Sequence, residues 1–251
     1  TKELDRALLD NEIDLAVHSL KDVPTQIPDE LTIAAVTERE DVHDVFIPNP
    51  KYRSLTLKNI PKGGEIATGS LRRRSQLLYY RPDLSIIEIR GNLNTRVEKL
   101  KTSLWHGMIL AYAGVVRLGW KEIIGEIIPT SISLPAVGQG ALGIIARKDN
   151  ASVLSLLDVL NHQPTRTAVL AERALLRRLE GGCQIPIGAQ GTVNGNTLNL
   201  EAFVGDIRGK KNMRKKISGK GEECERLGIQ LAEQLLDEGA GDILNEIRNL
   251  T

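Results

Sequence analysis

The stretch that decides the fold is residues 65–101, EIATGSLRRRSQLLYYRPDLSIIEIRGNLNTRVEKLK. Strands are predicted at Glu65–Thr68 and Leu84–Arg90, and each leads into a segment with helical spacing, Ser70–Tyr80 and then Asn94–Lys101. Strands that alternate with helices at this spacing favour a parallel sheet covered by helices on both faces. This stretch therefore indicates an α/β fold.

The alternation extends to both sides of this stretch. Residues 13–36 predict a strand, a short turn or helix, and a second strand, and residues 133–147 predict a crossing segment that leads into a buried strand. After two further helices, alternating residues and turn signals such as Asn194-Gly195-Asn196 predict three antiparallel strands and two closing helices. The strands are expected at Ile185–Val193, Thr197–Val204 and Lys211–Ser218. The order is thus α/β, α/β, and then a small α+β unit.

Composition excludes several function classes. The 251 residues carry 33 Lys+Arg against 32 Asp+Glu, a balance that argues against a general nucleic-acid or membrane-surface binder. No apolar run approaches the roughly 20 residues of a membrane span. Two cysteines cannot form a disulfide framework, and four scattered histidines suggest no metal cluster. We expect a cytoplasmic protein without a metal.

Arginines follow several of the predicted strands. Three of them, Arg72, Arg73 and Arg96, come early in helices, where the positive end of the helix dipole disfavours cations unless an anion is bound there. Each one taken alone is more often a surface charge, whereas a set that converges on one rim of the sheet would bind a ligand with several carboxylates or phosphates. No nucleotide-binding glycine motif accompanies them. The arginines concerned are Arg72, Arg73, Arg90, Arg96 and Arg117.

Two further positions carry candidate chemistry. AVHSLKDVPT, residues 16–25, places Ser19, Lys21 and Asp22 in one turn, although a turn-forming role for Asp22 is the commoner one. Cys183 follows Gly181 and Gly182 at the end of a predicted helix, and a lone cysteine is more often an inert buried thiol. The glycines make an accessible sulfur more plausible there. A non-catalytic binding protein for a polycarboxylate small molecule remains the alternative, and it would have no need of this cysteine.

Six motifs resemble one family. HSLKDVPT, GSLRRRSQL, IRGNLNTR, AGVVRLG, LPAVGQGALG and LEGGCQIPIGA occur in family order over nearly the whole chain, and together they are similar to porphobilinogen deaminase, also called hydroxymethylbilane synthase. The resemblance implies a transferase of haem biosynthesis. It would join four porphobilinogen molecules head to tail into hydroxymethylbilane, release ammonia each time, and build the product on a covalent dipyrromethane cofactor.

The resemblance also implies roles for individual residues. Cys183 would hold the dipyrromethane cofactor through a thioether, and Asp22 would be the catalytic carboxylate that stabilises cationic intermediates. The implied cofactor-binding residues are Ser19, Lys21, Ser70, Arg72, Arg73 and Arg96. The implied substrate-binding residues are Thr68, Arg90, Arg96 and Arg117. The family works as a monomer, without metal, nucleic acid or membrane.

The family fold consists of two lobes that resemble periplasmic binding proteins, followed by a small C-terminal α+β domain. The resemblance implies a discontinuous first lobe at residues 1–38 and 138–160, a second lobe at 43–134, and a C-terminal domain with a three-stranded antiparallel sheet at 163–251. Family members begin with a strand and a G-T-R-x-S-x-L-A stretch that is not found here. We therefore expect an N-terminal segment ahead of Thr1.

Overall fold

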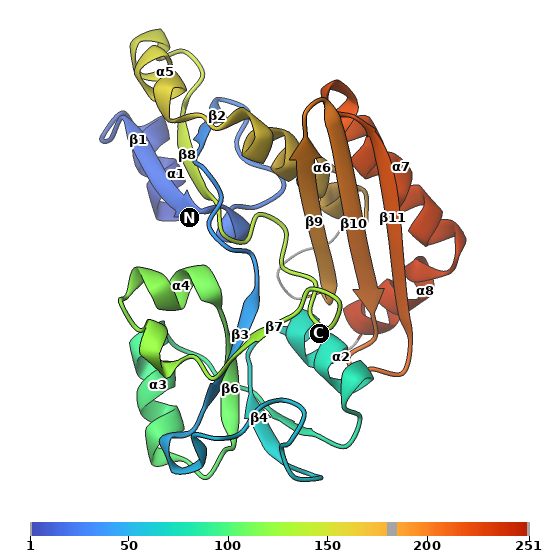
Figure 1. The fold of residues 1–251 in the computed structure, drawn as a ribbon. Helices are drawn as coiled ribbons and strands as arrows, with labels where there is room; N and C mark the ends of the chain where they lie inside the picture. The colour runs from blue at the N-terminus through green and yellow to red at the C-terminus, as the bar shows by residue number, and fades with distance from the viewer. Residues whose placement is uncertain (1, 180–184, 250–251) are drawn as a thin grey trace.

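The computed structural model describes residues 2–179 and 185–249, which form three β-sheets with helices packed against them (Figure 1). The first sheet has the order β1-β8-β2, the second β5-β4-β6-β3-β7, and the third β11-β10-β9. No helix in these two ranges is both long and apolar enough to cross a membrane. The mixed α/β class and the separate three-stranded antiparallel sheet at the C-terminus are confirmed.

The first sheet joins strands that are distant in sequence. After α1 (Lys2–Leu9), β1 (Leu15–Ser19) and β2 (Leu31–Val36) lie on either side of β8 (Leu142–Arg147), and both pairings are antiparallel. Helix α5 (Ala151–Leu157) follows β8. The chain therefore leaves this sheet after β2 and returns to it more than a hundred residues later.

The second sheet contains the stretch that decided the fold. Strand β4 is parallel to β5 and β6, whereas β3 is antiparallel to β6 and β7, so the expectation of a wholly parallel sheet is wrong. The reason is that β3 enters the sheet from the segment that follows β2 and not from a helix of its own. The strands are β3 (Asp44–Pro48), β4 (Glu65–Ala67), β5 (Ser85–Ile87), β6 (Gly107–Ala111) and β7 (Glu126–Ile128). The helices are α2 (Leu71–Tyr80), α3 (Leu93–Thr102) and α4 (Tyr112–Arg117).

Alternating side chains divide the core of the second sheet between its two faces. Val45 and Ile47 of β3 belong to one buried cluster, and Phe46, which lies between them, belongs to the other. Successive strand residues point to opposite faces, so a single apolar strand contributes to both layers. The sheet is therefore buried on both faces, as its apolar strands indicate.

The third sheet is a meander of β9 (Ile187–Asn194), β10 (Thr197–Gly205) and β11 (Asn212–Lys220), all antiparallel. Its buried face packs on α6 (Gln163–Arg178), α7 (Cys224–Asp237) and α8 (Ala240–Arg248). Helix α6 runs between the first sheet and this one (Figure 1). It is the element through which the first sheet and the C-terminal sheet meet.

Candidate active site

The turn that carries Asp22 comes directly after β1. Leu20 and Val23 are buried, and the Leu20 amide donates to the Ala141 carbonyl at 3.0 Å, so the backbone of the 3-10 turn Leu20–Asp22 is fixed against the β8 side of the first sheet. The alternation of buried and outward positions leaves Lys21 partly buried and Asp22 exposed. The turn thus presents an ammonium and a carboxylate next to each other at the end of a strand.

The N-terminus of α2 lies at the end of β4 in the second sheet. Ser70 is the N-cap of α2, and its side chain accepts a hydrogen bond from the Arg73 amide at 3.4 Å. The Ser70 amide donates to Oγ1 of the buried Thr68 at 3.3 Å. Ser70 therefore caps the helix, and Thr68 holds the backbone of Ser70.

Arg72 and Arg73 do not form a solvated basic face, because both are buried and bound to Asp44. Arg72 Nη1 lies 2.8 Å from Asp44 Oδ2, and Arg73 Nη2 lies 2.8 Å from Asp44 Oδ1. Arg72 also donates to the Leu134 carbonyl at 2.6 Å, and Arg73 donates to the Ile109 carbonyl at 3.2 Å. A planar guanidinium matches a carboxylate with two parallel bonds, so this pairing fixes the direction of both side chains.

Asp44 is the functional residue that the sequence reasoning missed. It is fully buried, and it accepts further hydrogen bonds from Ser133 Oγ at 2.7 Å and Gln139 Nε2 at 3.0 Å. The two arginines hold the pKa of its carboxyl well below the usual range, against the opposing effect of burial. Residues 38–44, EREDVHD, contain three other acidic side chains, and only the apolar run Val45–Ile47 that follows Asp44 distinguishes it from them.

The electrostatics place three of the predicted cations in one field. Burial lowers the pKa of Lys21, and Arg73 lowers it further while Asp22 and Asp44 oppose the shift. Burial also lowers the pKa of Arg96, again with Arg73 as the next cause. Such mutual effects require proximity. Lys21 therefore lies within electrostatic reach of Arg73, Asp22 and Asp44, and Arg96 lies within electrostatic reach of Arg73.

Two predicted residues lie outside this group. The Arg90 side chain is 87% exposed and pairs with Glu88 at 2.8 Å. Arg117 is exposed at the last position of α4. Within the described part of the chain, neither contributes to the shifted pKa values of Lys21, Arg96 or Asp44. The structure thus does not bring Arg90 and Arg117 into the cationic group.

The predicted tether Cys183 lies outside the described residues, in the sequence between α6 and β9. Cys224, at the start of α7, is partly buried and packs against the C-terminal core. Burial raises the pKa of its thiol, which is the reverse of what activates a sulfur nucleophile. Cys224 is therefore a structural residue.

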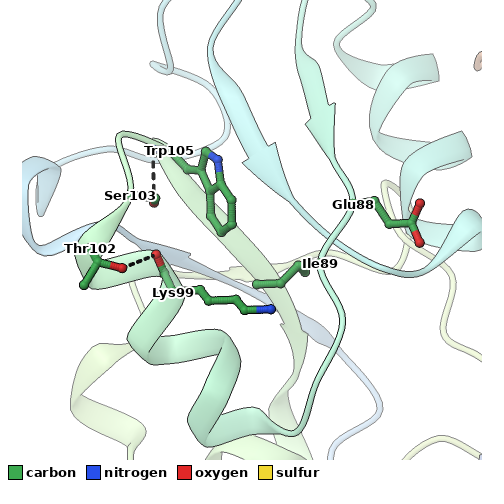
Figure 2. A pocket seen from close by; sticks show the side chains of 6 residues that line it. All are labelled: Glu88, Ile89, Lys99, Thr102, Ser103 and Trp105. Atoms are coloured by element: carbon green, nitrogen blue, oxygen red, sulfur yellow. Dashed lines mark hydrogen bonds between the residues drawn. The ribbon is translucent and has the colours of Figure 1, made fainter.

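A surface pocket lies elsewhere on the second sheet, where α3 packs beside the chain after β5 (Figure 2). In it, Thr102 Oγ1 donates to the Lys99 carbonyl at 3.2 Å, and the Trp105 amide donates to Ser103 Oγ at 3.2 Å. Glu88 and Ile89 complete its lining. None of the predicted site residues lines this pocket, so it is distinct from the candidate active site.

Comparison with known proteins decides the family. A family model described as the porphobilinogen deaminase dipyrromethane cofactor-binding domain matches residues 1–155, and that of the porphobilinogen deaminase C-terminal domain matches residues 166–237. The chain belongs to the porphobilinogen deaminase family. The resemblance found in the six motifs is confirmed, and the family makes the chain a transferase of haem biosynthesis with a dipyrromethane cofactor. The non-catalytic alternative is not favoured.

Curated relatives extend the match over the full chain. Porphobilinogen deaminase of Chlorobium phaeobacteroides is 52% identical over 252 residues, which cover 99% of this chain and 80% of the relative. That of Geotalea uraniireducens is 49% identical over 246 residues, covering 98% of this chain and 76% of the relative. The aligned region thus includes the first two sheets and the C-terminal unit.

Solved structures of periplasmic binding proteins are more distant. One from Brucella ovis with glutathione bound gives a TM-score of 0.41 at 16% identity, over 71% of this chain and 53% of that one. An arginine-specific one from Salmonella typhimurium gives 0.38 at 17% identity, over 63% and 69%. These likenesses are too low to bear on the site.

Proposed function

We propose that this chain condenses four porphobilinogen molecules head to tail into hydroxymethylbilane with release of ammonia. One observation carries the proposal: Lys21 and Arg96 both lie within electrostatic reach of Arg73, and Lys21 precedes Asp22 in the same turn. Each pyrrole of the substrate bears an acetate and a propionate, so a growing chain of pyrroles accumulates carboxylates. The cations suit binding of those carboxylates. The carboxylate of Asp22 suits stabilisation of the positive charge that develops on the pyrrole.

The residues present fit the dipyrromethane group. Arg72 Nε is buried and has no hydrogen-bond partner among residues 2–179 and 185–249. The pKa values of Lys21 and Arg96 are lowered because burial and a neighbouring cation are not offset by enough negative charge. A polycarboxylate would relieve both conditions. The cofactor supplies the free pyrrole carbon on which the product grows, and we propose that Cys183 holds it as a thioether. Its carboxylates would bind Ser19, Lys21, Ser70, Arg72, Arg73 and Arg96.

We assign substrate binding to Thr68, Arg90, Arg96 and Arg117 on the strength of the motifs. Arg96 supports the assignment, because its pKa shift places it near Arg73. Arg90 and Arg117 are exposed and able to turn toward an incoming carboxylate, since long side chains at a surface adopt many rotamers. Their role is to attract and orient each new substrate molecule.

We propose Asp22 as the catalytic carboxylate. Its exposed side chain follows a strand end and lies close enough to Lys21 to affect the pKa of that amine. A fixed anion stabilises positive charge as ammonia leaves and as the next ring is attacked, the type of effect worth several kcal/mol in enzymes. The same carboxylate can accept a proton from the new pyrrole ring.

The remaining parts of the proposal concern organisation. We propose a cytoplasmic monomer that acts on a small molecule and uses neither nucleic acid nor membrane, in keeping with the balanced charge. We also propose a first lobe at residues 1–38 and 138–160, a second at 43–134, and a C-terminal domain at 163–251. The return of β8 to pair with β1 and β2 supports the discontinuous first lobe.

Intact-protein mass spectrometry tests the proposal. The purified holoenzyme should carry an added mass equal to two linked porphobilinogen units, and the Cys183→Ser variant should lack it. The matched Cys224→Ser variant should keep the adduct, because that thiol packs against the core. An unmodified wild-type mass, or an adduct retained by Cys183→Ser, would overturn the assignment of the tether.

A further inference from the structure

Helix α6 has two buried faces that contact different sheets. Val169 belongs to the core beneath the first sheet, whereas Ala171 and Leu175 belong to the core beneath the C-terminal sheet. Positions three or four residues apart share a helix face. Arg166 and Arg173 are therefore on the face of Val169. Arg166 reaches a carbonyl of β2, and Arg173 reaches the backbone between β1 and β2.

Arg173 binds the backbone that follows Asp22. Its Nη1 donates to the Val23 carbonyl at 3.0 Å, and its Nη2 donates to the Pro24 carbonyl at 2.5 Å. The side chain is buried, with 5% of the residue exposed. The planar guanidinium thus donates hydrogen bonds to two successive carbonyls directly after the turn that carries Asp22.

The desolvation cost of burying Arg173 is not explained by packing alone. Both of its hydrogen-bond acceptors in the described structure are neutral carbonyls, and no carboxylate there forms an ion pair with it. Burial, and next the neighbouring Arg177, lower the pKa of Arg173 to about 10, so the group stays charged at neutral pH at a cost in desolvation. A neutral side chain could fill the same space without that cost.

The position of Asp22 depends on this backbone. Among the described residues, no group forms a hydrogen bond with the Asp22 carboxylate, so its location is set by the turn that carries it. The turn is held on one side where the Leu20 amide donates to Ala141, and on the other where Arg173 holds Val23 and Pro24. Loss of the hydrogen bonds on either side would release that end of the turn from the rest of the structure.

We propose that Arg173 is a positioning residue that holds the turn of Asp22 in place for catalysis. The inference rests on the proposed role of Asp22. It also means that α6, the helix that leads toward Cys183 in the sequence, and the catalytic turn move as one piece. Their relative geometry is then independent of how the second sheet moves.

The test compares Arg173→Gln with Arg166→Gln in the holoenzyme. Arg166 is the matched control, because it lies on the same helix face and donates to a first-sheet carbonyl, that of Ile33 at 3.0 Å, away from Asp22. We expect Arg173→Gln to lower kcat by roughly 10- to 100-fold with KM within about twofold of wild type, because misplacement of a reacting group affects the chemical step. Arg166→Gln should change neither by more than about twofold.

Hydrogen exchange gives a readout that does not depend on activity. The Val23 amide donates to the Leu20 carbonyl at 3.2 Å, and Arg173→Gln should speed its exchange by about tenfold or more, because the turn then opens locally. Arg166→Gln should leave it unchanged. If Arg173→Gln does not fold, Arg173→Lys, which keeps the charge but loses the fork, should show the same two effects at smaller size.

The outcomes separate the inference from the proposed function. Equal kcat and equal Val23 exchange in the Arg173 and Arg166 variants would overturn the positioning role. So would a change confined to KM. Asp22→Asn serves as the reference: near-normal turnover in that variant sinks the proposed role of Asp22 itself, whereas lost turnover with a fully active Arg173→Gln sinks only the positioning role.

Discussion

At the scale of the residue, Asp44 decides the geometry of Arg72 and Arg73. Arg72 and Arg73 come from one helix and would repel each other if buried without a counter-charge. Asp44 lies between them, and Ser133 and Gln139 satisfy its remaining lone pairs. The group retains one net positive charge, two guanidiniums against one carboxylate, which is available to attract a carboxylate ligand.

Removal of that carboxylate should be costly. We expect Asp44→Asn to lower the free energy of unfolding at neutral pH by about 3–5 kcal/mol, because two buried cations lose their partner. The pKa of Asp44 is held below its ordinary value of 3.8, so the unfolded chain binds the proton more tightly. The stabilisation is therefore complete above that value and is lost as the pH falls below it.

Urea unfolding at a series of pH values measures both effects. Wild type should lose stability as the pH is lowered through about 4, and Asp44→Asn should lose less over the same interval. Asp10→Asn is the control, since Asp10 forms an exposed ion pair with Arg6 and its loss should leave the unfolding midpoint in place. Parallel pH profiles for Asp44→Asn and wild type would contradict this account.

At the scale of the element, the pair α6 and α7 depends on a close approach at Gly228. A Cβ at Gly228 would overlap the Ala171 carbonyl oxygen and lie 3.0 Å from Ala174 Cβ. Both partners are on α6, one of them a backbone atom that cannot rotate away. Small residues let two helices approach closely, and here they bring α7 onto the helix that also contacts the first sheet.

The expected effect of Gly228→Ala is therefore the reverse of helix propensity. Alanine is favoured over glycine within a helix by about 1 kcal/mol, yet overpacking should lower the unfolding free energy by roughly 1–3 kcal/mol. Gly241→Ala on α8 is the matched control. Its Cβ would meet only Leu236 Cδ2 at 3.8 Å, so it should be neutral or stabilising. Thermal unfolding distinguishes the two variants. A rise in Tm for both would show that the contact between α6 and α7 accommodates a methyl group at Gly228 without overpacking.

At the scale of the whole molecule, Glu172 joins segments from all three sheets. Its carboxylate accepts from Arg39 Nη1 at 2.6 Å, in the segment between β2 and β3, and from the Gly138 amide at 2.8 Å, in the segment between β7 and β8. It also accepts from the Gly191 amide at 2.7 Å in β9. One fully buried side chain thus forms hydrogen bonds with the two segments that connect the first sheet to the second. It also forms a hydrogen bond with a strand of the third sheet.

We expect Glu172→Gln to lower the unfolding free energy by about 3–5 kcal/mol, because a buried cation loses its partner and the amide nitrogen faces a donor. Glu225→Gln is the control, since Glu225 pairs with Arg177 at 3.5 Å on the surface. That substitution should lower the free energy of unfolding by less than about 1 kcal/mol. Denaturant unfolding compares the two directly. Similar midpoints for the two variants would show that Glu172 does not hold the junction.

Local pattern was enough for much of the fold. Strand β4 begins at the predicted Glu65, and α2 and α3 begin within one residue of their predicted starts. The C-terminal meander was also predictable, because its strands pair with their sequence neighbours through short turns. These features depend on contacts between residues near in sequence.

The chain by itself determined its elements, its family and the residue types of its site, through motifs such as GSLRRRSQL and HSLKDVPT that are legible one segment at a time. Only the tertiary structure decided which charges meet. Asp44 and Arg73 are 29 residues apart, and Arg173 and Val23 are 150 apart. Burial is what makes those pairings strong, and burial is a property of the packed molecule that no local spacing encodes.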